Sequence, residues 1–292
     1  MRLALLGLGL IGGSVARAAH AAGWHVAAWT PSGTGPRIAR AEGAIDVAAG
    51  TRREALADAD LVVLAAPPVA CLELLVALAS AERDALRGDV VISDVASTKV
   101  LLVERAAALG LRYVGGHPMA GRETSGFDAG SADLFRDRPW VMVPPAATDE
   151  AAVARVEELV RACGARPLRM TAAEHDAAVA AISHLPLVVA AALVEAVAGG
   201  PGDPVPPGWP AAAALAAGGW AGATRLALGQ PAMGAGIAAT NAGPLAAGVR
   251  AIRDRLDEWI VLLEAGAGHG PPDEAALRER FAAARDRLGG RG

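Results

Sequence analysis

The stretch RLALLGLGLIGGS, residues 2–14, decides how the N-terminal half of the chain folds. Its first residues, Arg2 to Leu6, predict a strand, and a glycine-rich turn and a helical pattern then run through Ala22. Strand, G-x-G-x-x-G and helix in this order are typical of a dinucleotide-binding site, where glycines let a pyrophosphate approach backbone N–H groups at a helix N-terminus. A chance glycine turn is the weaker interpretation directly after a strand. The predicted cofactor contacts are Gly7, Gly9, Leu10, Ile11 and Gly12.

The end of the second predicted strand, His25 to Trp29, bears on the choice of cofactor. An acidic residue at this end would bind the ribose 2′-hydroxyl of NAD⁺. Thr30 stands there instead, followed by the hydroxyl of Ser32 and the guanidinium of Arg37, which are groups that can bind a phosphate. The sequence therefore favours NADP⁺ slightly over NAD⁺. The alternative is that Arg37 only covers a helix surface.

Apolar runs alternate with helical patterns over the next hundred residues. A fully apolar run at 61–65 and a second strand pattern at 89–93 enclose a helical pattern over 69–87, as in parallel strands joined by crossover helices. The other elements predicted in this half are strands at 112–114 and 140–143, a helix at 149–163 and an edge strand at 165–170. Loops at the carboxyl ends of parallel strands face the ligand. We therefore predict that Ala66, Pro67 and Ser97 contact the cofactor.

The loop Asp94-Val95-Ala96-Ser97-Thr98-Lys99 holds the only lysine of the chain. Because it follows a sheet strand, it should face the ligand cleft. Its structural alternative is the capping of the next helix by Ser97 or Asp94. We keep Lys99 as a candidate substrate contact.

A second glycine-rich stretch, Gly115-Gly116-His117-Pro118-Met119-Ala120-Gly121-Arg122-Glu123-Thr124-Ser125-Gly126, contains a histidine between a glycine pair and a proline. A tight turn after a strand would explain the glycines and the proline. A histidine on a cleft loop can also serve as a general base, because its pKa lies nearest to neutral pH. The nucleotide motif upstream favours the second interpretation.

Alanine-rich helical patterns replace the strands beyond residue 170. The segment Thr171-Ala172-Ala173-Glu174 predicts a capping box that opens a long helix to Ala198, with a kink or local break at Pro186. A loop at 199–210 and helices at 211–217, 220–228, 233–265 and 273–288 complete the prediction. The chain is thus expected to be α/β, with a Rossmann-type doubly wound sheet at 1–168 and an all-helical domain at 169–292 whose apolar surface forms a dimer.

Composition excludes several classes of protein. The 292 residues carry a formal net charge of −4 without a basic block, which argues against nucleic acid as a partner. No apolar run of 18 or more residues is evident, and the N-terminal apolar run is too short for a signal peptide. Cys71 and Cys163 lie far apart without the spacing of a metal site. We expect a cytoplasmic protein that binds neither metal nor membrane.

Six segments, read together, resemble the prephenate and arogenate dehydrogenases of tyrosine biosynthesis. They are the N-terminal glycine motif, Asp94-x-x-Ser97-x-Lys99, Gly115-Gly116-His117-Pro118-Met119-Ala120-Gly121, Glu174-His175-Asp176, Ser183-His184-Leu185-Pro186 and Ala223-Thr224-Arg225. The resemblance covers residues 1 to 265 and implies a Rossmann domain, a helical dimerisation domain and an active site between them. It implies an oxidoreductase that decarboxylates prephenate or arogenate and transfers hydride to NAD⁺ or NADP⁺.

The same resemblance gives roles to individual residues. His117 matches the catalytic histidine that hydrogen-bonds the ring hydroxyl of the substrate, and Ser97 matches a serine that positions this histidine and the nicotinamide. Arg225 matches an arginine that binds a substrate carboxylate, and Glu123 matches an acid near the substrate side chain. His184 joins the substrate-binding candidates, whereas His175 and Asp176 are as well explained as core, cap or local ion-pair residues.

Two departures from the family pattern lie in the helical half. Leu187 stands where many relatives have a second histidine, and Trp220-Ala221-Gly222 replaces Phe-Arg-Asp ahead of Arg225. Two alternatives therefore stay open. One is a dehydrogenase of the 3-hydroxy acid type, which the absence of any lysine after Lys99 disfavours. The other is a nucleotide-binding regulatory protein that has lost catalysis.

Overall fold

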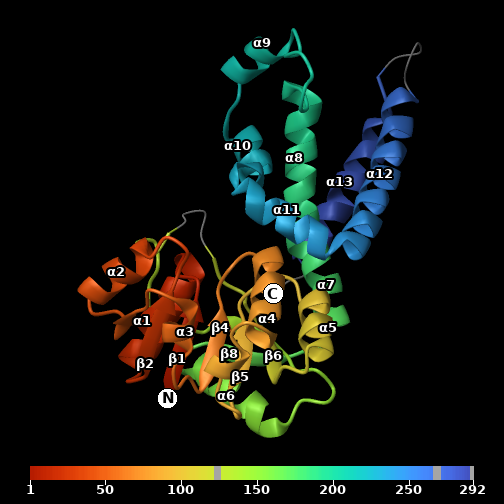
Figure 1. Cartoon of the computed structure of the whole chain (residues 1–292). Helices are drawn as coiled ribbons and strands as arrows, with labels where there is room; N and C mark the ends of the chain where they lie inside the picture. Colours follow the sequence, from red (N-terminus) through yellow and green to blue (C-terminus); the bar gives the residue numbers. More distant parts are fainter. Residues whose placement is uncertain (122–125, 266–270, 290–292) are drawn as a thin grey trace. The chain divides into compact units, whose positions relative to one another are not determined.

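The computed structural model describes residues 1–121, 126–265 and 271–289 (Figure 1). The chain divides into two compact units, Met1–Pro244 and Leu245–Gly292. The predicted domain boundary at residue 168 lies inside the first unit and stays a prediction.

One eight-stranded sheet organises the first unit, with the strand order β3-β2-β1-β4-β5-β6-β7-β8. Every neighbouring pair is parallel except β6 and β7, which are antiparallel. Chain order reverses beside β1, as in a doubly wound sheet, and this is where the glycine motif emerges. The strands are β1 (Arg2–Leu6), β2 (His25–Trp29), β3 (Val47–Ala48), β4 (Leu61–Leu64), β5 (Val91–Asp94), β6 (Tyr113–Pro118), β7 (Pro139–Val143) and β8 (Arg166–Arg169).

Helices cover both faces of this sheet. Successive side chains of β1 point to opposite faces, so that Leu3 and Leu5 join one buried cluster and Ala4 and Leu6 join another. The first cluster includes residues of α1 and α6, and the second includes residues of α3, α4 and α5. The predicted doubly wound α/β fold is confirmed. The helices of this part are α1 (Leu10–Ala21), α2 (Thr34–Ala41), α3 (Arg52–Leu56), α4 (Pro68–Ala79), α5 (Val100–Ala108) and α6 (Glu150–Ala162).

The stretch around His117 is strand rather than the predicted loop. β6 continues through Pro118, and His117 lies opposite Val141 of β7. The glycine pair is required by close packing and not by a turn. A Cβ on Gly116 would lie 2.4 Å from the carbonyl oxygen of Asp94, and one on Gly115 would lie 3.0 Å from the Lys99 side chain.

A helix with a widened turn follows the sheet. The predicted capping box is present, because Thr171 and Glu174 exchange hydrogen bonds at the start of α7 (Ala172–Val179). Next to Pro186, where a kink or local break was predicted, residues Ala180–His184 form a π-helical turn, and α8 (Leu185–Ala198) continues from it. Proline removes an N–H and its ring collides with the carbonyl four residues earlier, and a widened turn before it accommodates both defects.

The remaining helices of the first unit are shorter than predicted. They are α9 (Trp209–Ala214), α10 (Gly218–Thr224), the 3₁₀ turn Arg225–Leu228 and α11 (Pro231–Thr240). The single helix predicted over 233–265 is wrong, because the chain breaks at Asn241 before α12 (Ala242–Glu264) begins. The backbone of Asn241 is not helical, and its side-chain amide donates a hydrogen bond to the carbonyl oxygen of Asp176.

The second unit is a pair of helices, α12 and α13 (Glu274–Gly289). Arg280 of α13 pairs with Glu258 of α12 at 2.7 Å, and its guanidinium lies 4.8 Å from the ring centroid of Trp259. Trp259 also packs against Phe281, with 4.9 Å between ring centroids.

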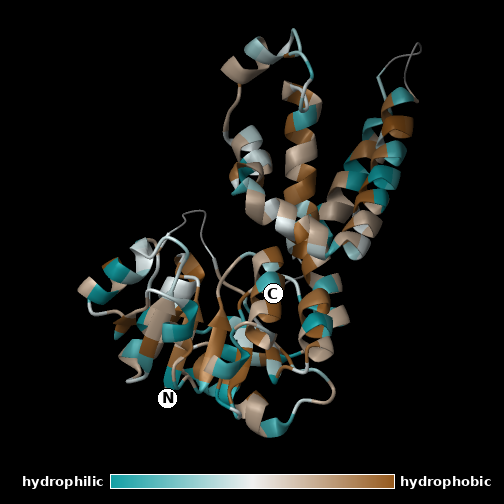
Figure 2. Ribbon diagram, in the orientation of Figure 1, coloured by the Kyte–Doolittle hydropathy of each residue, from teal (hydrophilic) through white to brown (hydrophobic). Residues whose placement is uncertain are grey.

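The helical run Ala172–Ala198 corrects the expectation that no apolar run reaches the length of a membrane span. By length and composition these 27 residues could cross a membrane, a test that the core helix of a soluble protein also passes. Figure 2 shows α8 as mostly hydrophobic, and Ala190 is its one buried residue. Most of its other residues are only half-buried, and such a partly covered apolar helix is a surface that another protein chain can bury.

Candidate active site

The glycine motif forms the turn that a pyrophosphate requires. Gly7 has φ +113°, and a Cβ on it would lie 2.2 Å from the carbonyl oxygen of Ala65. A Cβ on Gly12 would lie 2.5 Å from the carbonyl oxygen of Gly7, so both positions need glycine for packing. Gly9 caps α1 and has open space around it, while Leu10 and Ile11 form the first turn. The N-terminus of a 12-residue helix is thus accessible to an anion.

The loop between β2 and α2 holds the three residues expected to select the cofactor. The Thr30 hydroxyl accepts a hydrogen bond from the backbone N–H of Gly33 at 3.1 Å, and Ser32 is exposed beside it. Arg37, on the first turns of α2, turns back over the loop: a Cβ on Gly33 would lie 3.1 Å from its Nη1. The structure therefore brings hydroxyls and a guanidinium together at the end of β2.

Two further loops leave the carboxyl edge of the sheet beside β1. Ala66 and Pro67 follow β4, and Pro67 caps α4. Ser97 follows β5, and its Oγ is buried without a hydrogen-bond partner among the described residues. A buried hydroxyl without a partner costs free energy, so a ligand that hydrogen-bonds to it would recover that cost.

His117 begins a chain of hydrogen bonds that ends at a carboxylate. Its Nδ1 lies 2.8 Å from Nε2 of His175, and Nδ1 of His175 lies 2.7 Å from Oδ1 of Asp176. His117 comes from the sheet and the other two from α7. His175 and Asp176 are each 1% exposed, whereas His117 is partly exposed. We call these three residues the histidine chain.

Lys99 lies in a second buried cluster beneath His117. Its ammonium pairs with Oδ1 of Asp94, whose Oδ2 accepts a hydrogen bond from the Tyr113 hydroxyl. Asp94 also accepts hydrogen bonds from the backbone N–H groups of Ala96 and Gly116. The Lys99 side chain has no exposed surface. This placement gives the predicted substrate contact no support, because the ammonium is committed to Asp94. We call Asp94, Lys99 and Tyr113 the Asp94 network.

Burial, above all, lowers the pKa of His117 well below its ordinary value, and the positive charge of Lys99 acts in the same direction. A neutral imidazole at neutral pH can accept a proton, as a general base must. The pKa of Tyr113 is raised by burial and by the neighbouring Asp94 carboxylate. Its phenol therefore stays protonated and serves as a donor.

His184 is one of the two buried residues of the π-helical turn, and Ala180 is the other. His184 is 1% exposed, and Nδ1 lies 3.1 Å from the Asn241 amide nitrogen, while Nε2 is buried without a partner among the described residues. Burial lowers the pKa of His184, and only the Asp176 carboxylate opposes this effect. π-Helical turns occur frequently at functional sites. An unpaired ring nitrogen on one fits a ligand contact.

Arg225 and Glu123 are the other two predicted substrate contacts. Arg225 opens the 3₁₀ turn after α10, and this turn packs against α8, the helix that starts directly after His184. Glu123 lies outside the described residues. Leu187 contacts α11, because a Cβ on Gly234 would lie 3.6 Å from its Cδ2. The roles of Arg225 and Glu123 stay predictions.

Three residues of the site were not among its predicted members. His175 and Asp176 belong to a quoted motif, and the signal that could have placed them in the site is two adjacent titratable residues near the start of a long apolar helix. Asn241 hydrogen-bonds to the Asp176 carbonyl and to His184. Only its position as a helix-breaking polar residue inside a long helical pattern could have indicated it.

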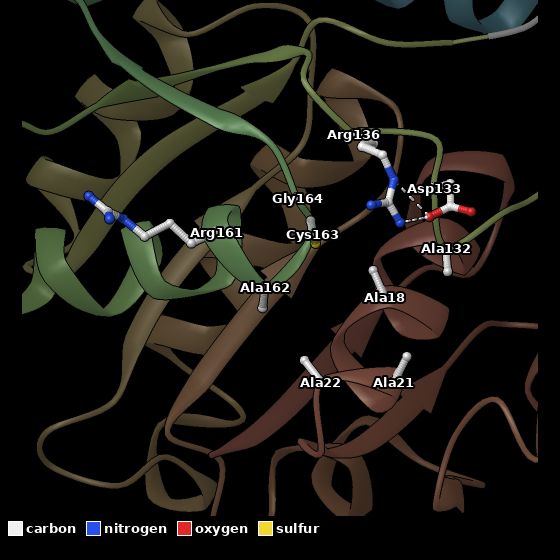
Figure 3. A pocket seen from close by; sticks show the side chains of 10 residues that line it. All are labelled: Ala18, Ala21, Ala22, Ala132, Asp133, Arg136, Arg161, Ala162, Cys163 and Gly164. Atoms are coloured by element: carbon white, nitrogen blue, oxygen red, sulfur yellow. Dashed lines mark hydrogen bonds and ion pairs between the residues drawn. The ribbon is translucent and has the colours of Figure 1, made fainter.

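A surface hollow elsewhere on the sheet domain contains none of these residues. Figure 3 shows it between α1, the segment around Asp133 and the C-terminal end of α6, with Arg136 paired to Asp133. Arg161, on its rim, pairs with Glu157 at 2.5 Å. Alanines form half of its lining, and its charged side chains are paired with one another or with Glu157, so the hollow offers little chemistry to a ligand.

Comparison with known proteins agrees with this geometry. Residues 16–168 match the family model for the prephenate dehydrogenase nucleotide-binding domain, and residues 171–270 match the one for the prephenate dehydrogenase dimerization domain. The chain is 34% identical over 261 residues to prephenate dehydrogenase of Bacillus subtilis (strain 168), a match that covers 88% of this chain and 66% of that protein.

Two further relatives have other names. The chain is 36% identical over 201 residues to cyclohexadienyl dehydrogenase of Zymomonas mobilis, which covers 68% of this chain and 67% of the relative. Its structure resembles that of Synechocystis arogenate dehydrogenase, with a TM-score of 0.77, 28% identity, and coverage of 99% of this chain and 100% of that one. With both domain models matched in order over most of its length, the chain belongs to the prephenate dehydrogenase family.

Proposed function

We propose that this protein oxidises prephenate or arogenate at the ring hydroxyl, with transfer of hydride to a nicotinamide cofactor and loss of the ring carboxylate as CO₂. The observation that carries the proposal is the position of His117, a half-buried histidine at the carboxyl edge of a nucleotide-binding sheet, where burial lowers its pKa. Family membership supports the same reaction. The matched part of the chain spans about two thirds of the length of the Bacillus relative, so the activity is inferred for this chain rather than transferred whole.

The residues at the edge of the sheet fit a nicotinamide cofactor. Gly7 and Gly12 close the turn tightly, and the open space at Gly9 leaves the N-terminus of α1 free for a pyrophosphate. The orphaned hydroxyl of Ser97, one loop along the same edge, fits a contact with the nicotinamide end. When bound, the cofactor accepts the hydride from the carbon that carries the hydroxyl.

The chain supplies the other two groups that the reaction needs. His117 accepts the hydroxyl proton as hydride leaves the same carbon. Arg225 binds a substrate carboxylate, for which a guanidinium is well suited. Once the ring carbon is a carbonyl, its conjugated system draws electrons from the ring carboxylate, and CO₂ leaves as the ring becomes aromatic. The protein therefore positions groups, and aromatisation drives the reaction.

The β2–α2 loop supports NADP⁺ over NAD⁺. It ends β2 with Thr30 instead of an acid, and it folds the guanidinium of Arg37 over Gly33. A 2′-phosphate would meet a cation and two hydroxyls there, whereas a free 2′-hydroxyl would lack its carboxylate partner. Arg37→Ala should raise the KM for NADP⁺ and leave the KM for NAD⁺ unchanged.

A direct assay tests the reaction, the substrate and the cofactor together. Purified protein is mixed with prephenate or arogenate and with NAD⁺ or NADP⁺, and reduced cofactor is followed at about 340 nm. We expect turnover in at least one combination, with NADP⁺ the better cofactor. Bound cofactor without turnover in all four mixtures would favour the alternative of a nucleotide-binding regulatory protein.

The helical half supports a homodimer. The second family model is that of a dimerization domain, and several large apolar side chains are strongly exposed, among them Leu215, Leu228, Val261 and Phe281. Surfaces of this kind are normally buried between subunits. Sedimentation velocity should give a mass of twice 29.3 kDa at micromolar concentration.

A further inference from the structure

The base of the proposed reaction is not isolated: His175 links it to a buried carboxylate. The imidazole rings of His117 and His175 meet edge to face, with centroids 5.1 Å apart and an interplanar angle of 76°. This geometry points a ring nitrogen of one histidine at a ring nitrogen of the other, 2.8 Å away. One of the two must donate and the other accept, so the proton on one ring determines the proton on the next.

The far end of the histidine chain is fixed by α5. Asp176 accepts hydrogen bonds from the backbone N–H of Lys99 at Oδ1 (2.7 Å) and of Val100 at Oδ2 (2.8 Å). These N–H groups begin α5, whose N-terminus attracts negative charge. Because N–H donors occupy both oxygens, Asp176 acts as an acceptor, and His175 Nδ1 must carry the proton between them.

We propose that Asp176 and His175 hold His117 in the one tautomer that can act as a base. With its proton on Nδ1, a neutral His175 presents a lone pair at Nε2, which can only accept. His117 must then carry its own proton on Nδ1 and leave the lone pair on Nε2. None of the residues that the structure describes hydrogen-bonds to Nε2 of His117, so this nitrogen remains for the substrate hydroxyl.

Charge around His117 favours the neutral state that this assignment requires. The groups that face it are Lys99 from the β5–α5 loop, His175 from α7 and His184 from the π-helical turn, with Asp94 neutralising Lys99. Burial above all, and next the charge of Lys99, lower the pKa of His117. His175 and Asp176 are positioning residues in this scheme, since His117 alone touches the reacting atoms, and the scheme rests on the proposed function for its chemical consequence.

The opposite proton arrangement would disable the base. If His175 were an imidazolium, both of its nitrogens would donate, and Nδ1 of His117 would have to accept. His117 would then carry its proton on Nε2 and present a donor to the substrate hydroxyl. The two arrangements place the His117 proton on different atoms, so a spectroscopic measurement separates them.

Nuclear magnetic resonance of the full chain, labelled with ¹⁵N-histidine, reads the tautomer directly. Long-range ¹H–¹⁵N correlations distinguish protonated from unprotonated ring nitrogens, and the spectrum of His117→Asn identifies the His117 signals. At neutral pH we expect the proton on Nδ1 and an unprotonated Nε2 in both His117 and His175. A proton on Nε2 of His117 would overturn the proposal.

Kinetics of two His175 variants test the consequence. The amide oxygen of His175→Gln can still accept the Nδ1–H of His117 and its NH₂ can donate to Asp176, so this variant should keep turnover within about 10-fold of wild type. His175→Leu has no acceptor, and kcat should fall by about 100-fold or more, as when a base loses its correct tautomer, with KM for the cofactor unchanged. Equal losses in both variants would overturn the proposal.

A matched control separates positioning from loosening of α7. Thr171→Ala removes the cap of α7 and leaves the histidine chain intact. If His175→Leu and Thr171→Ala lower Tm to a similar degree, only the former should lower kcat; a comparable kcat loss in the control would count against the positioning role. The tautomer measurement needs no substrate, so failure of the wild-type assay would refute the proposed function without touching this result.

Discussion

Two buried polar clusters lie side by side beneath the edge of the sheet, and they differ in how completely they are satisfied. The Asp94 network is closed: its carboxylate accepts from Lys99, Tyr113 and two backbone N–H groups. We call Ser97, His184 and the histidine chain the open cluster, since Ser97 Oγ and His184 Nε2 are buried without partners among the described residues. In a closed network every buried polar group has its hydrogen-bond partner once the chain folds. In an open cluster some buried polar groups gain a partner only when a ligand binds.

This difference predicts separate consequences for separate substitutions. Changes in the closed network should lower the free energy of unfolding first, and changes in the open cluster should lower turnover while leaving stability nearly intact. The largest effect is expected at the reacting atom itself.

His117→Asn should lower kcat by about 10²- to 10⁴-fold, the usual contribution of a general base. The side chain is partly exposed and sits at the end of β6, so the fold should tolerate the smaller amide. Steady-state kinetics measures the loss of kcat, and fluorescence titration with the cofactor checks that the fold still binds it. Unchanged turnover would remove His117 from its role, and lost cofactor binding would show that the substitution acts through the fold.

The pH profile of the wild-type enzyme sharpens the same assignment. Because the pKa of His117 lies well below its ordinary value of 6.5, the neutral base persists as pH falls through 6.5. The acid limb of kcat/KM should therefore lie below pH 6.5. In the unfolded chain His117 is protonated near its ordinary pKa of 6.5, whereas in the folded protein it stays neutral to lower pH. The free energy of unfolding should therefore decline as pH falls from about 6.5 toward the lowered pKa of the folded protein. An acid limb above pH 6.5 would contradict the assignment.

Lys99→Met should destabilise the protein by about 3–5 kcal/mol, because it leaves the buried Asp94 carboxylate without its cation. Denaturant unfolding followed by circular dichroism measures this loss. The double variant Lys99→Met with Asp94→Asn is the control: it removes both charges and should recover part of the stability. A single variant as stable as wild type would show that the network is not the closed structural unit described above.

Much of the sheet could be predicted from the sequence because its signals are local. β1 and β2 were predicted with the bounds that the structure gives, since each is an apolar run next to an unambiguous turn. β3 spans two residues and α3 five, too few for a hydrophobic period to show. The extension of β6 through His117 was missed because the glycine pair indicates a turn locally, whereas its cause is a long-range contact with Asp94.

The residue types of the site could be predicted from the sequence, but the hydrogen bonds and ion pairs between them could not. His117, Ser97 and Lys99 stand in motifs, yet only the fold reveals that Lys99 turns inward to Asp94, while no described residue hydrogen-bonds to the hydroxyl of Ser97. Asn241 lies more than fifty residues from both Asp176 and His184, and its contacts depend on how α11 returns to α7. No local pattern encodes that return.

Arg225 tests whether substrate binding separates from both clusters. Arg225→Ala should raise the KM for the substrate by about 10- to 150-fold, the equivalent of about 1.5–3 kcal/mol for a hydrogen bond to a charged group, and should change kcat much less. The KM for the cofactor is the internal control. A wild-type substrate KM would show that the carboxylate is bound elsewhere.

Ser97→Ala should have the smallest effect on turnover, and the sign of its effect on the free energy of unfolding is informative. The Ser97 hydroxyl is buried and has no partner among the residues that the structure describes, so its removal should leave the free energy of unfolding unchanged or raise it. In the reaction the hydroxyl gains a partner, and its loss should lower kcat/KM by about 2- to 12-fold, the equivalent of about 0.5–1.5 kcal/mol. Tyr113→Phe is the matched comparison, because it also removes one hydroxyl but from the closed network, where stability should fall. If Ser97→Ala lowered the free energy of unfolding as much as Tyr113→Phe, the Ser97 hydroxyl would have a structural role. If the free energy of unfolding rose in Ser97→Ala and fell in Tyr113→Phe, the Ser97 hydroxyl would serve the ligand.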